Sequence, residues 1–168
     1  LEFDEDSADS NEALRAITPA LDAALEQMIS MRADEGKHLH VDTQNRIYNL
    51  ETITQQIETE APSVIIKHKE NLHRRLAESG LELDLDDERI LKEIIIFADR
   101  SDITEEITRL HSHVEKFRQY LGQDEPIGRP LDFLCQELNR EFNTIGSKAN
   151  NAVLAQLIVD AKIELEKI

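Results

Sequence analysis

The stretch between Pro19 and Pro62 most constrains the fold, because Gly36 is the only glycine or proline that interrupts it. Apolar residues recur along this stretch at a near-heptad spacing, which is typical of a long helix packed against another helix. They are Leu21, Leu25, Met28, Leu39, Leu50, Ile53 and Ile57. The same spacing places Arg32 and Glu35 at contact positions, where an interhelical salt bridge fixing the register is the expected use.

Proline, glycine and capping residues divide the chain into helices. Thr18 followed by Pro19 predicts a helix start, and Pro62 predicts a kink or restart of a helix that ends at Ser79-Gly80. A cap at Asp86 or Asp87 opens a short apolar helix. Asp102 and Glu105 fit a capping box for the next one. Pro130 opens a helix that "NTIGSK" breaks, and residues 149–168 form the last helix.

These elements predict an all-α protein of long antiparallel helices with a C-terminal helical bundle, extended rather than globular. We expect an acidic lead-in at 1–17, a long helical hairpin at 18–80 and a C-terminal helical domain at 81–168. The first residue is not Met and the last residues lie in mid-helix, so we expect the chain to be part of a longer one.

The composition excludes several classes of protein. The formal net charge is -16, and residues 1–60 hold 14 of the 35 acidic but 4 of the 19 basic residues, which argues against a broad basic surface. The lone Cys135 excludes an internal disulfide. A zinc site is rejected because the histidines of "HLH" and "HSH" would point about 200° apart on a helix. No apolar run could span a membrane, and a cytoplasmic protein is expected.

A polar line runs beside the apolar face of the helix that starts near Asp102. It contains Asp102, Glu106, Arg109 and His113, which could supply divalent-metal ligands, a phosphate clamp and a proton carrier. By spacing alone the structural alternative is favoured. In that case Asp102 caps the helix, and Glu106 with Arg109 is an ordinary ion pair.

The helix at 131–145 has an apolar stripe and a polar remainder, with Phe133 pointing outward. Ser147 and Lys148 fall at the expected N-terminus of the last helix, where free N–H groups could hold a phosphate. A serine cap beside a solvated lysine is an equally good reading.

Three segments together resemble the YicC/YloC family of bacterial proteins. They are "MRADEGKHL" (31–39), "ADRSDITEEITRLHSHVEKF" (98–117) and "GRPLDFLCQELNREFNTIGSKANNA" (128–152). The resemblance implies an endoribonuclease that assembles as a hexamer enclosing RNA and depends on Mn2+ or Mg2+. It implies neither a membrane nor a small organic cofactor. The N-terminal domain typical of the family and its final helical turn are expected to be missing here.

The resemblance also implies candidate site residues. The catalytic candidates are Glu106, His113, Asp132, Glu137 and Glu141. The RNA-binding candidates are Arg32, Arg109, Gln136, Arg140 and Lys148. The metal-ligand candidates are Glu35, Asp102, Glu106, Glu137 and Glu141.

Two mechanisms and one alternative function stay open. Carboxylates could hold a metal that activates water, which the acidic composition favours, or His113 could deprotonate the ribose 2′-OH. Phe133 would be covered by another subunit. The alternative function is a helical scaffold that assembles and binds RNA or another partner without chemistry.

Overall fold

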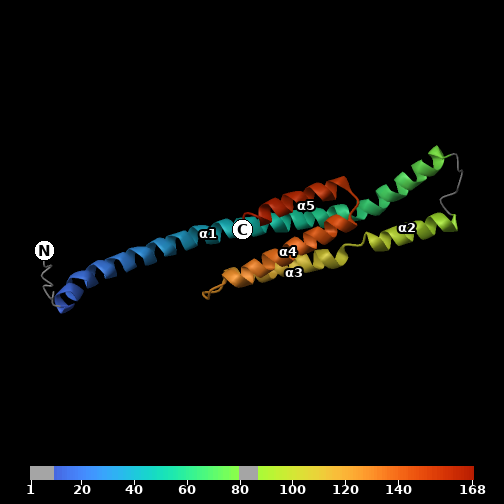
Figure 1. Ribbon diagram of the computed structural model, residues 1–168. Helices are drawn as coiled ribbons and strands as arrows, with labels where there is room; N and C mark the ends of the chain where they lie inside the picture. The colour runs from blue at the N-terminus through green and yellow to red at the C-terminus, as the bar shows by residue number, and fades with distance from the viewer. Residues whose placement is uncertain (1–9, 80–86) are drawn as a thin grey trace, which may run out of the picture. The chain divides into compact units, whose positions relative to one another are not determined.

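A computed structural model describes residues 10–79 and 87–168, and every regular element in these ranges is an α-helix (Figure 1). The all-α class is therefore confirmed. The helices are α1 (Ser10–Glu78), α2 (Glu88–Arg100), α3 (Thr104–Leu121), α4 (Gly128–Lys148) and α5 (Ala152–Leu165). None of them is long and apolar enough to cross a membrane, within the described residues.

The chain divides into two compact units, residues 1–42 and 43–168. In the described part of the first unit, α1 carries its apolar side chains in the open. Leu21, Leu25, Met28 and Leu39 are each between 43% and 57% exposed. The predicted near-heptad residues do lie on a helix, but no other described element of this unit covers them.

The second unit contains the hydrophobic core. The C-terminal part of α1, α3, α4 and α5 each contribute residues spaced three or four apart, so each helix turns one apolar stripe inward. α3 and α4 pack side by side, and α5 packs on α4. The core residues that are completely buried are Leu50, Ile57, Leu110, Phe117, Leu138, Phe142, Ile145, Leu154 and Ala161.

α1 is one helix where two were expected. The predicted start at Thr18 is wrong: the helix begins before it, and the Thr18 hydroxyl donates to the Leu14 carbonyl within the helix. Pro62 was predicted to mark a kink or a restart, and the restart is wrong because α1 runs through Pro62 as one helix. Ile57 and Val64 on either side of Pro62 are buried in the same core, which keeps the helix continuous although the proline lacks an N–H group. The predicted kink agrees with the bend that α1 shows where its colour passes from teal to green (Figure 1). Residues 18–78 thus do not form a hairpin, and the division into domains stays a prediction.

The boundaries between α4 and α5 also differ from expectation. "NTIGSK" does not break α4, which continues to Lys148, and the Ser147 hydroxyl donates to the Thr144 carbonyl. The last helix starts at Ala152, where the Asn151 side chain accepts from the Val153 N–H. Ser147 and Lys148 therefore lie at a helix C-terminus, and the phosphate site expected at a helix N-terminus there is wrong. The cap predicted at Asp86 or Asp87 is confirmed at Asp87, and Asp86 lies outside the described residues.

Candidate functional site

A row of charged and polar side chains joins α3 to α4 along one side of the helix pair. Near the start of α3, the Lys148 amine lies 2.8 Å from Glu106 Oε1. One turn farther, Arg109 Nη1 lies 3.5 Å from Glu141 Oε1. Residue numbers rise along α3 while those of their partners fall along α4, so the two helices are antiparallel. This register was not visible in either helix alone.

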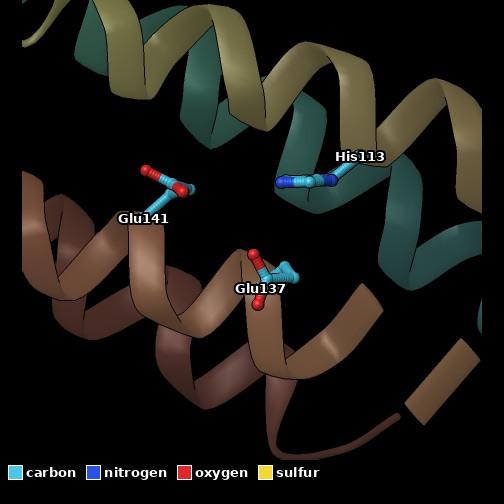
Figure 2. A group of neighbouring side chains, drawn as sticks. All are labelled: His113, Glu137 and Glu141. Carbon is cyan, nitrogen blue, oxygen red and sulfur yellow. The ribbon is translucent and has the colours of Figure 1, made fainter. Parts of the chain in front are cut away.

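The next step of the row brings together His113, Glu137 and Glu141 (Figure 2). One ligand atom from each of them lies within 4.8 Å of the other two, and among the described residues no other three His, Cys, Asp or Glu side chains meet in this way. His113 comes from α3 and the two glutamates from α4. Glu137 and Glu141 are four residues apart, so they project from one face of their helix.

Burial differs within this group. The Glu141 side chain is only 3% exposed, whereas His113 and Glu137 are half-buried. Burying a carboxylate is costly unless a positive charge or hydrogen-bond donors lie beside it. Arg109 is the positive charge beside Glu141, so the group has a buried end and a solvent-accessible end.

Two arginines flank the group. Arg109 bridges Glu141 and Glu105, the latter being exposed and one turn away on α3. The guanidinium of Arg140 lies 4.0 Å from Glu137 Oε2 and is itself 71% exposed. Glu105 was expected only as a capping residue, and its i,i+4 spacing from Arg109 was the signal that could have revealed the pair.

Glu106 does not form the ion pair with Arg109 that was expected as the structural alternative. It pairs with Lys148, and its Oε2 atom is buried and has no hydrogen-bond partner among the described residues. Lys148 also donates to the Asp102 carbonyl at 2.9 Å, which ties the C-terminus of α4 to the N-terminus of α3.

Asp102 serves the start of α3. Its carboxylate accepts from the Thr104 N–H at 2.9 Å and from the Thr104 hydroxyl at 2.6 Å. These hydrogen bonds, led by the one from the hydroxyl, hold the pKa of Asp102 below its ordinary value. The capping box predicted from Asp102 and Glu105 is wrong: the N-cap of α3 is Ile103, which makes no side-chain cap hydrogen bond, and Glu105 pairs with Arg109.

The remaining candidates lie outside the three-residue group. Asp132 accepts a hydrogen bond from Gln136 on the exposed side of α4. Phe133, 59% exposed, points outward as predicted. Arg32 and Glu35 are exposed residues of the first unit. Of the residues proposed from the sequence, the structure thus gathers Arg109, His113, Glu137 and Glu141, with Arg140 beside them, and their roles stay predictions.

Comparison with known proteins identifies the family. The sequence profile described as "Endoribonuclease YicC-like, C-terminal" matches residues 57–168. The chain belongs to the YicC-like family. The match includes every residue of the α3–α4 row but neither Arg32 nor Glu35, so the family assignment and the gathered site rest on the same segment.

Two curated YicC relatives extend the comparison. A protein of Clostridioides difficile (strain 630), named probable endoribonuclease YicC, is 38% identical over all of this chain and 58% of its own length. A protein of the same name from Haemophilus influenzae is 36% identical over 89% of this chain and 51% of its own length. The chain therefore spans between half and three-fifths of the length of these YicC relatives.

Proposed function

We propose that this chain carries the RNA-cleaving site of an endoribonuclease, located where α3 faces α4. The observation that supports this proposal is the convergence of His113, Glu137 and Glu141 across two helices of the segment that matches the family. Both relatives are named as probable endoribonucleases, which gives the reaction class.

The three side chains fit a divalent cation, which we propose to be Mn2+ or Mg2+. Two carboxylates and one imidazole form a mixed oxygen and nitrogen donor set. Such a set suits Mn2+ well, while Mg2+ is held mainly by oxygen ligands and water. When bound, the cation would polarise the scissile phosphate and activate a water molecule.

The chain's own residues divide the remaining work. Glu141 is buried and held by α4, so it anchors the site, while Glu137 and His113 lie at its accessible end. Arg109 has 47% of its side chain exposed and presents a planar donor fork that matches two phosphate oxygens. Arg140 lies closer to solvent and would contact a neighbouring phosphate. A formal charge of -16 makes these local cations necessary for RNA to approach.

We also propose that the protein works as a homo-oligomer, a hexamer by resemblance to its family. Phe133 and the apolar face of α1 in the first unit are exposed, and a second subunit would cover such surfaces.

The test is a cleavage assay with the full-length protein and a 5′-labelled structured RNA in Mn2+, Mg2+ or EDTA. His113→Ala, Glu137→Gln and Glu141→Gln should each reduce the rate by about 100-fold or more, since ligands and their supporting groups typically matter on this scale. Glu115→Gln, an exposed glutamate on α3, is the matched control and should leave the rate unchanged.

The product ends separate the possible mechanisms. Metal-dependent cleavage leaving 5′-phosphates supports the proposal. Cleavage that resists EDTA and leaves 2′,3′-cyclic phosphates would instead make His113 the base that deprotonates the 2′-OH. A full-length protein that never cleaves RNA would leave the scaffold function in its place.

A further inference from the structure

Arg109 has two partners in the proposed site, because it would bind an RNA phosphate and it also neutralises Glu141, a residue assigned to the metal. Its guanidinium lies 3.5 Å from the carboxylate of Glu141, and that carboxylate is almost completely buried. No other positively charged group is within ion-pair distance of Glu141 among the described residues. Arg109 is thus the counter-ion of the Glu141 carboxylate in this part of the chain.

We propose that Arg109 and the divalent cation exchange at Glu141, so that Arg109 is released toward the RNA phosphate when the metal binds. This inference rests on the proposed metal site. It assigns to Arg109 a link between cation binding and RNA binding, in addition to contact with the substrate.

Electrostatics make the two occupants of Glu141 compete. One carboxylate carries a single negative charge, and a cation bound to it would lie within a few ångströms of a guanidinium held by the same group. Two positive charges at that separation repel, and the burial of Glu141 beside them screens this repulsion less than open solvent would. Arg109 therefore withdraws as the cation binds.

The released side chain stays at the site because of its second partner. Arg109 also pairs with Glu105, which is 69% exposed and lies on the same helix. Glu105 thus gives the guanidinium a partner at the solvent-facing edge of the row. A guanidinium there can bind a phosphate through two parallel hydrogen bonds.

Arg140 provides an internal comparison. It too lies beside a proposed ligand, Glu137, but at 4.0 Å and with 71% of its side chain exposed. An exposed pair of this kind is screened and weak. The exchange should therefore be specific to Arg109, although both residues carry the same charge and flank the same group.

The experiment measures Mn2+ binding to the full-length protein by electron paramagnetic resonance, without turnover. Arg109→Gln should bind Mn2+ about tenfold more tightly than wild type, since the positive charge that competes with the metal for Glu141 is removed. Arg140→Gln should stay within about twofold. Glu141→Gln should lose most of the binding, which identifies the site being measured.

A second measurement follows the affinity for a fully 2′-O-methylated RNA, used as a non-cleavable probe, with and without Mn2+. Wild type should bind the probe more tightly when Mn2+ is present, and Arg109→Gln should lose most of that gain. Arg109→Lys keeps a counter-charge for Glu141 but not the planar fork. Arg109→Lys should bind Mn2+ like wild type but lose part of the increase in RNA affinity that Mn2+ causes. If Arg109→Gln does not fold, Arg109→Lys is the variant that tests the exchange.

The outcomes distinguish the inference from the proposed site. Equal Mn2+ affinities in wild type and Arg109→Gln, with binding lost in Glu141→Gln, would overturn the exchange and keep the metal site. An equal increase of Mn2+ affinity in Arg109→Gln and Arg140→Gln would also overturn the exchange, because the loss of any nearby positive charge would then have the same effect. Mn2+ binding that Glu141→Gln leaves intact would remove the metal site and the exchange together.

Discussion

At the scale of single residues, the α3–α4 row combines groups that stabilise the fold with groups that are free to act. Lys148 and Glu106 belong to the first kind, because the carboxylate is buried and both ends of the pair are tied to helix termini. Arg109, His113 and Glu137 are more exposed. The same row therefore contains a rigid end and a reactive end.

Lys148→Met should lower the free energy of unfolding by about 3 kcal/mol, since it leaves the buried Glu106 charge without its partner. The change is measured by urea denaturation of the full-length protein. Lys37→Met is the matched control, because Lys37 and Asp34 are both exposed, and it should change stability by less than about 0.5 kcal/mol. Adding Glu106→Gln to Lys148→Met should recover part of the loss. A Lys148→Met protein as stable as the control would contradict this reading of the pair.

Glu60 provides a prediction about pH. Hydrogen bonds from Lys67, then Ser63 and Asn151, lower its pKa from 4.5 to about 2. A pKa depressed in the folded state contributes stability that is present above pH 4.5 and is lost as the pH falls from there toward 2. Wild type should therefore be more stable than Glu60→Gln at neutral pH, with the difference shrinking on acidification. Urea midpoints measured for both proteins at several pH values check this, and a difference that grows in acid would refute it.

At the scale of the elements, the sequence identified which segments are helical but not how far each helix extends. Apolar spacing located the buried stripe of α4, and Leu134, Leu138, Phe142 and Ile145 are indeed buried. The restart predicted at Pro62 and the break predicted at Gly146 failed, because local propensities of a few kcal/mol were outweighed by packing on both sides.

The candidate site could be predicted only in part for a related reason. His113 could be proposed from the polar line of its own helix, whereas Glu137 and Glu141 were proposed from the resemblance to the family. Which residues meet depends on the register between α3 and α4, which no single helix encodes. Lys148 was placed in the wrong element because the break predicted at "NTIGSK" does not occur, and its pairing with Glu106 was not foreseen.

Gly146 lies within α4 and faces α5. A Cβ atom built on it would lie 3.6 Å from Ile158 Cδ1, an ordinary packing distance. Gly146→Ala should thus raise the free energy of unfolding by about 0.5–1 kcal/mol, because alanine restricts the unfolded chain and favours helix. Thermal and urea unfolding of both proteins measure this change in the free energy of unfolding. Gly36→Ala, in the open part of α1, should leave the unfolding of the core unchanged, and a destabilised Gly146→Ala would show that the helices approach more closely.

At the scale of the whole molecule, the two units of the chain differ in how far the side chains of α1 are buried. In the second unit Ile47, Leu50, Ile57 and Val64 of α1 are buried, whereas residues 12–39 of the same helix are exposed throughout. A helix without packing is marginal in water, so its stability must come from another surface.

Hydrogen exchange tests this difference. At low protein concentration, amides of residues 14–39 should exchange faster than those of residues 47–64, because local opening of the first segment exposes no core. Protection of residues 14–39 that increases with concentration would indicate a covering subunit. Equal and concentration-independent protection in both segments would contradict the prediction and show that the same chain covers the first segment.

The antiparallel pairing of α3 and α4 has a consequence for how the protein acquires its site. The side chains gathered there belong to two consecutive helices, and the ion pairs that join these helices link residues 32 and 42 positions apart in the sequence. The pairs that join α3 to α1 link residues 53 and 67 positions apart. Contacts of smaller sequence separation close at a lower entropic cost and tend to form earlier in folding. The site should therefore assemble with the hairpin itself, before the long-range contacts to α1 are made, and its geometry would be inherited by any longer chain in which this hairpin folds.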